Sequence, residues 1–172
     1  MVQTVELVVD EETEAAVRRA WDVLAAAGLP SQARHTGATN RPHVTLAVAA
    51  AIPASLESRL AAAVAGLPIP VRLGGLVCFA GRRWVLARLV VPSAELLRVH
   101  SAVADIVLGC PGLSPLMFPG RWTPHVTLAR GLAVEALGTA LGLLGDRAEL
   151  VGDAVAARRY DSERRTDWPL TP

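Results

Sequence analysis

The chain has 172 residues, 52% of them apolar, so it can bury a sizeable core and an intrinsically disordered protein is excluded. Its 17 basic and 16 acidic residues leave a formal net charge of +1, which does not fit a protein that coats nucleic acid by bulk electrostatics. The two cysteines lack C-x-x-C spacing, so neither a disulfide framework nor a zinc site is indicated.

The elements alternate along the chain in a regular way. Apolar residues at every second position predict strands, apolar stripes at helical spacing predict helices, and Gly and Pro mark the ends. The first half predicts a strand at 2–9, a helix from the cap Asp10 to Gly28, a polar loop at 31–42, a strand at 43–49, a helix capped by Ser55, and a hairpin of 69–79 and 84–91. The second half predicts a helix from Ser93 to about Leu108, a loop at 109–124, a strand at 125–130, a helix at 134–144, a strand at 149–160 and a polar tail.

No shift in composition marks a linker, so we expect one α+β unit over residues 1–172, built from two similar halves. The N-terminus has no basic region and its apolar run ends at Asp10, unlike a signal peptide. No uncharged apolar stretch reaches the roughly 18 residues that a membrane span needs. We therefore expect a soluble, cytoplasmic protein without membrane contacts, and a monomer.

The most informative feature is a repeated hexapeptide. PHVTLA occurs at 42–47 and again at 124–129, and each copy holds one of only four histidines at the start of a predicted strand. A single His-x-Thr of this kind is usually a half-buried polar pair with satisfied hydrogen bonds. Two copies in matched contexts favour a functional site.

Strand geometry indicates what the repeat can do. Because successive side chains point to opposite faces, His43 and Thr45 share one face while Val44 and Leu46 enter the core, and the second copy does the same with His125 and Thr127. Two such strands facing each other would surround a phosphate. The hydroxyls would donate to its oxygens, one imidazole would take a proton, and the other would give one.

Other phosphate chemistries fit less well. No third ligand stands at metal spacing near either motif, so we expect no metal and no cofactor. The sequence also lacks the Gly-rich loop with Lys that cradles a triphosphate, which disfavours an ATP-driven mechanism.

The paired motifs, each closing a loop and opening a strand about half the chain apart, resemble those of the two-histidine (2H) phosphoesterase superfamily. Within it the chain looks most like the bacterial 2′-5′ RNA ligase and RNA 2′,3′-cyclic phosphodiesterase branch. The resemblance implies a bilobal, pseudo-two-fold α+β fold, with two antiparallel sheets facing across a central cleft and helices outside. It also implies catalysis by His43 and His125, and phosphate binding by Thr45, Thr127 and Arg130.

Four further residues are weaker candidates for substrate binding. Arg34 and Arg41 lie in the loop before the first motif, and Arg121 and Trp122 lie just before the second. Arginine could hold backbone phosphates and Trp122 could stack on a base. Exposed arginine is more often solvated, however, and a tryptophan in a Pro-rich loop more often packs on the core.

Three functions follow as hypotheses. The first is hydrolysis of 2′,3′-cyclic phosphodiester ends of RNA or nucleotides, the second is 2′-5′ RNA ligation by the same groups, and the third is non-catalytic binding of an RNA end or nucleotide. Substrate preference and the assignment of acid and base stay open at this point.

Overall fold

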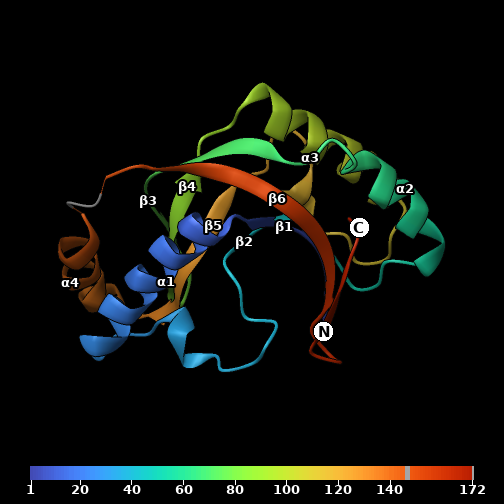
Figure 1. Ribbon diagram of the computed structural model, residues 1–172. Coiled ribbons are helices and arrows are strands. Elements are labelled where there is room, and N and C mark those ends of the chain that lie inside the picture. The colour runs from blue at the N-terminus through green and yellow to red at the C-terminus, as the bar shows by residue number, and fades with distance from the viewer. Residues whose placement is uncertain (146–147, 172) are drawn as a thin grey trace.

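The computed structural model describes residues 1–145 and 148–171, and its elements follow the expected alternation (Figure 1). The helices are α1 Glu11–Ala26, α2 Glu57–Ala63, α3 Ala94–Val107 and α4 Val134–Leu144. The strands are β1 Gln3–Val9, β2 His43–Ala49, β3 Ile69–Phe79, β4 Trp84–Val90, β5 His125–Leu132, β6 Leu150–Asp161 and β7 Thr166–Pro169. The α+β class is confirmed.

The strands form one sheet in the order β2-β1-β6-β3-β4-β5, with β7 added to β6, and the paired strands are antiparallel. The expectation of two separate sheets is therefore wrong. The reason is the length of β6, whose first half pairs with β3 while its second half pairs with β1. Figure 1 shows β6 as a long curved arrow that joins the two halves of the molecule.

The helices lie in two groups against this sheet (Figure 1). Helix α1 contacts β5, β6 and α4, whereas α3 contacts β2, β3 and α2. The predicted caps Asp10 and Ser93 are confirmed, since each side chain accepts a hydrogen bond from a backbone N–H of the first turn. Within residues 1–145 and 148–171, every helix is too short or too polar to serve as a transmembrane segment.

Two local predictions are wrong. Ser55 does not cap α2, because a short 3₁₀ turn at Ala54–Leu56 precedes the helix and no side-chain cap is made. The predicted polar tail contains β7, in which Trp168 and its neighbours pair with the end of β6. β7 lies at the surface and has few buried residues, so it lacks the alternation of apolar residues that predicts a strand.

The loop at 109–124 runs along the free edge of β2. Ala50 donates its N–H to the oxygen of Pro111, and Ser114 donates to the oxygen of Val48, both over 2.9 Å. Gly112 sits at this contact with φ +63°, and a Cβ on it would lie 2.7 Å from the Cβ of Ala50. The segment that leads into the second motif is thus attached to the strand of the first.

Candidate active site

The two motif histidines have matching hydrogen bonds. Nδ1 of His43 lies 2.7 Å from the backbone oxygen of Arg41, and Nδ1 of His125 lies 2.7 Å from that of Thr123. A carbonyl oxygen only accepts, so Nδ1 of each ring carries the hydrogen. Each ring therefore keeps Nε2 for proton exchange with another molecule.

The alternation predicted for the motif strands is confirmed. Val44 and Leu46 of β2 and Val126 and Leu128 of β5 are fully buried. Both histidines are partly exposed on the other face of their strands, together with Thr45, which is partly exposed, and Thr127, which is 8% exposed.

The motif strands β2 and β5 stand at opposite ends of the strand order of the sheet. They nevertheless contact each other. Burial lowers the pKa of His125, the nearby positive charges of Arg130 and His43 lower it further, and the hydrogen bond with Thr123 opposes the shift. The two imidazoles are thus close enough for the charge of one to disfavour charge on the other.

Arg130 lies beside the hydroxyl of the second motif. Its Nη2 is 3.5 Å from Oγ1 of Thr127, and Arg130 is an exposed residue of β5. A guanidinium beside a hydroxyl and an imidazole forms a set of donors suited to a phosphate.

Two tryptophans connect the motifs to the opposite half of the chain. Nε1 of Trp122 donates to the backbone oxygen of Thr45 over 2.9 Å, and Nε1 of Trp21 in α1 donates to that of Thr127 over 3.0 Å. Each motif strand therefore has its threonine carbonyl held by an indole from elsewhere.

Trp122 is further held by a buried histidine of α3. Its ring is stacked on that of His100, with centroids 3.8 Å apart and planes 4° from parallel, and Nε2 of His100 donates to the oxygen of Met117 over 3.0 Å. One face and the N–H of the indole are thus occupied within the protein. These contacts favour packing over base stacking for Trp122.

Of the three candidate arginines in the loops, Arg41 contacts a motif histidine through its backbone oxygen, which is the partner of Nδ1 of His43. Arg41 is paired with Glu14 of α1 over 2.6 Å, and Arg34 donates to the oxygen of Gly28 over 3.1 Å. Arg121 is exposed, and its backbone N–H donates to Phe118. A substrate-binding role for these arginines stays a prediction.

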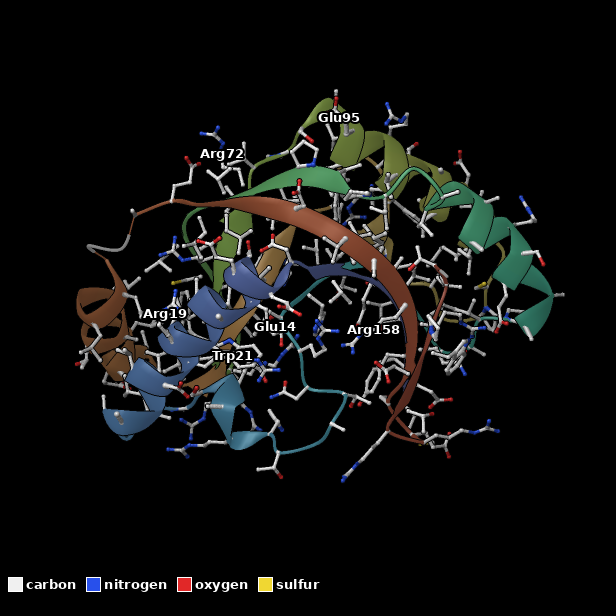
Figure 2. All side chains as sticks on the ribbon, in the orientation of Figure 1. Glu14, Arg19, Trp21, Arg72, Glu95 and Arg158 are labelled. Carbon is white, nitrogen blue, oxygen red and sulfur yellow. The ribbon has the colours of Figure 1, made fainter. Side chains whose placement is uncertain are left out.

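Sequence reasoning missed Phe79 and Glu6, which lie near the histidines. Phe79 at the end of β3 contacts the ring of His125, with centroids 4.6 Å apart. Glu6 in β1 is 3% exposed and has Oε1 3.6 Å from Nε2 of His43. Arg158 pairs with Glu6 over 2.9 Å, and Figure 2 shows it on the concave side of β6, away from α3.

A signal for Glu6 was present in the sequence. It interrupts the apolar run of the first strand, VELVV, on the face opposite Val5 and Leu7. The pairing of β1 with β6 brings Arg158 to Glu6. Within the described ranges, no group of three or more His, Cys, Asp or Glu side chains is arranged to hold a metal ion.

Solved structures with this fold cover nearly the whole chain. Usb1 of Kluyveromyces marxianus with uridine monophosphate is 16% identical, covers 98% of this chain and 97% of its own, and has a TM-score of 0.57. TT0787 of Thermus thermophilus is 19% identical, with coverages of 99% and 95% and a TM-score of 0.58. LigT of E. coli with NADP+ is 17% identical, with coverages of 99% and 97% and a TM-score of 0.56. Identities this low establish a common fold only.

A comparison with curated proteins by sequence finds no match. The model of the 2′-5′ RNA ligase superfamily, in contrast, matches residues 9–164, which include both motifs. Because this match spans most of the chain, the protein belongs to the 2′-5′ RNA ligase superfamily, the group of 2H phosphoesterases that its paired motifs resemble.

Proposed function

We propose that this protein hydrolyses 2′,3′-cyclic phosphodiester ends of RNA or nucleotides, with His43 and His125 as its acid and base pair. The observation that carries the proposal is that the two imidazole rings make equivalent hydrogen bonds. Each donates Nδ1–H to a carbonyl two residues earlier and keeps Nε2 for proton exchange. Structures of relatives in complex with uridine monophosphate and 3′-AMP support a nucleotide as the substrate.

In the proposed reaction, water attacks the phosphorus while one imidazole removes its proton. The bond between phosphorus and one ribose oxygen breaks, and the other imidazole protonates that oxygen, leaving a phosphomonoester. Thr45 and Thr127 donate hydrogen bonds to the non-bridging oxygens, and Arg130 attracts the negative charge. These steps require no metal ion.

The second candidate is 2′-5′ RNA ligation, which the name of the matching family supports. It is the same opening of the cyclic phosphate with a ribose 5′-hydroxyl in place of water: the new bond joins phosphorus to the 5′ oxygen, and the bond from phosphorus to the 3′ oxygen breaks. One imidazole removes the proton of the hydroxyl and the other protonates the 3′ oxygen. The two activities differ in their products, so chromatography of the products after incubation with an RNA 5′-hydroxyl end separates them.

The deciding experiment is turnover of a nucleoside 2′,3′-cyclic phosphate and of a cyclic-phosphate-ended oligonucleotide, in buffer with EDTA. We expect a bell-shaped pH dependence of kcat/KM. Loss of one acid or base should slow turnover by about 10²- to 10⁴-fold in His43→Ala and in His125→Ala. Unchanged turnover in both variants would remove the proposal.

Threonine variants provide the matched control for phosphate binding. Thr127→Ser keeps the hydroxyl, whereas Thr127→Val removes it at similar size, so the serine variant should retain activity and the valine variant should lose it. Tight binding of a nucleotide by the wild-type protein without turnover would support the third hypothesis, a non-catalytic binder, against both enzymatic ones.

A further inference from the structure

The two motif strands hold the same place in two three-strand units of the sheet. The first unit is β2, β1 and the second half of β6, and the second unit is β5, β4 and β3. In each unit the register of the motif strand against its neighbour skips one residue, and that residue is the motif leucine, Leu46 or Leu128. The shared irregularity aligns the two units residue by residue.

This alignment places an aromatic side chain at the equivalent position of each unit. Thr4 of β1 pairs with Tyr160 of β6, and Val85 of β4 pairs with Phe79 of β3. Thr4 and Val85 are equivalent because each also pairs with the residue three positions after its motif threonine. The chain has one tyrosine and two phenylalanines, so two of these three rings stand at matching places near the motifs.

Tyr160 lies on the face of the sheet that carries the first motif histidine. Residues two positions apart in a strand share a face, and so do directly paired residues of antiparallel strands. Arg158, two positions before Tyr160, pairs with Glu6, whose carboxylate is 3.6 Å from Nε2 of His43. Asp167, the partner of Tyr160 in β7, also contacts Arg158. Figure 2 shows Arg158 on the concave side of β6, so the phenol ring stands on the same concave face.

The surroundings of the two aromatic rings differ. The residue paired with the motif threonine is the small Ala87 in the second unit and Glu6 in the first. Beside Ala87, Phe79 lies against the ring of His125, with centroids 4.6 Å apart. In the first unit the ion pair of Glu6 occupies this place. Within residues 1–145 and 148–171, the side chain of Tyr160 has no hydrogen-bond, ion-pair or ring partner.

The register also shows that Tyr160 is close enough to the first motif to contact the same ligand. It is separated from His43 by the same number of strands and residues as Phe79 is from His125, and the latter two rings touch. Tyr160 is half-exposed. An open aromatic ring of this kind is what single-stranded nucleic-acid sites use to stack a base.

We infer that Tyr160 is a substrate-binding residue, whose ring stacks on the base of the nucleotide that has its phosphate at the motif histidines. The inference rests on the proposed function and deepens it, because it makes the base part of what the site recognises, in addition to the cyclic phosphate. Phe79, whose ring is already in contact with His125, is assigned to the placement of that imidazole.

The single tyrosine of the chain permits a direct test on the wild-type protein. Its ring gives one set of tyrosine signals in the NMR spectrum, and adenosine 3′-monophosphate should move these signals upfield through the ring current of the base. Ribose 5-phosphate has a phosphate but no base and should leave them in place. Tyrosine signals that stay in place at millimolar adenosine 3′-monophosphate would overturn the inference.

Substitution measures what the ring contributes to binding. Tyr160→Leu removes the aromatic face, whereas Tyr160→Phe keeps it and should restore binding. With adenosine 2′,3′-cyclic phosphate, Tyr160→Leu should raise KM roughly 5- to 150-fold with little change in kcat. With the 2′,3′-cyclic phosphate of 1-O-methylribose, which has no base, the wild-type protein and Tyr160→Leu should have the same KM. Equal losses on both substrates would overturn the inference.

Phe79→Leu is the matched comparison, because it removes the equivalent ring of the second unit. Since that ring lies against His125, its loss should lower kcat, and by the same factor for the nucleotide and for the phosphate without a base. A stronger dependence on the base in Phe79→Leu than in Tyr160→Leu would place the base in the second unit and overturn the inference.

Failure of the inference can be told apart from failure of the proposed function. If the wild-type protein turns over neither cyclic phosphate, the proposed function fails, and the tyrosine signals with adenosine 3′-monophosphate still decide whether Tyr160 stacks on a base. If the wild-type protein turns over the nucleotide and the phosphate without a base with equal KM, the proposed function stands and the inference fails.

Discussion

Trp122 donates its indole N–H to the backbone oxygen of Thr45, across 77 positions of sequence, over 2.9 Å. The donor lies three residues before the second motif histidine and the acceptor lies inside the first motif. This hydrogen bond therefore joins the two motif segments, in addition to the backbone bonds between the 109–124 loop and the edge of β2. The stack of Trp122 on His100 fixes the indole from its other side.

Removing this hydrogen bond should affect both stability and activity. Trp122→Phe leaves the oxygen of Thr45 without its donor, which should lower the free energy of unfolding by about 1–3 kcal/mol in urea titration. Because small misplacements of catalytic groups slow reactions strongly, kcat/KM should fall about tenfold or more. The control is Trp168→Phe, which loses a 3.1 Å bond to Glu57 remote from the motifs. Equal effects of both variants on kcat/KM would contradict a specific role for Trp122.

Gly112 offers a test of the loop that precedes the second motif. Gly112→Ala places a Cβ 2.7 Å from that of Ala50 at a φ of +63°, so strain and a clash combine. We expect a loss of unfolding free energy above the ~1 kcal/mol typical of an unfavourable positive φ alone. Gly120→Ala measures that smaller loss by itself, because φ is +81° and its Cβ would meet nothing within 4 Å. Similar urea midpoints for the two variants would show that the contact with Ala50 is not restrictive.

Local patterns were sufficient to predict most elements and the faces of the motif strands. Alternation in HVTL placed Val44 and Val126 in the core, and Asp10 and Ser93 cap the helices that follow them. These features depend on residues within a few positions of each other, and this is the range over which periodicity and capping act.

Long-range pairing could not be predicted in the same way. The ion pair of Glu6 and Arg158 joins residues 152 positions apart and depends on the register of β1 against β6. Whether the chain forms one sheet or two also depends on long-range pairing. β6 pairs with β3 through its first residues and with β1 through its last, and this joins the two halves of the chain in one sheet. Trp122 was predicted to lie near the site, but its partners His100 and Thr45 come from other elements.

His100 should make the protein less stable in mild acid. Burial lowers the pKa of His100, and its hydrogen bond to Met117 only partly opposes this. A histidine with a lowered folded pKa contributes stability above its unfolded value of about 6.5, and this contribution is lost as the pH falls through the folded pKa. Unfolding free energies in urea at a series of pH values should decrease below about 6.5. The lowered pKa of His125 contributes in the same direction.

The contribution of His100 can be separated by substitution. His100→Gln keeps a planar side chain and a donor for the oxygen of Met117 but does not titrate, so its stability should decrease less steeply with acid. His35→Gln is the control, because His35 is an exposed loop residue. A pH dependence unaltered by His100→Gln would show that this ring is not the source.

Arg130 should tune the pKa of His125 through its charge. The guanidinium is one of the charges that lower the pKa of His125, so Arg130→Gln should raise that pKa and move the limb of the kcat/KM profile that reports His125 to higher pH. Arg130→Lys keeps the charge and should leave the limb in place. Loss of a charge-assisted hydrogen bond to phosphate, worth about 1.5–3 kcal/mol, should also reduce kcat/KM of the glutamine variant roughly 10- to 100-fold on the alkaline side of that limb. If the limb moves equally in both variants, Arg130 acts through its shape and not its charge. If it moves in neither variant, Arg130 does not influence the pKa of His125.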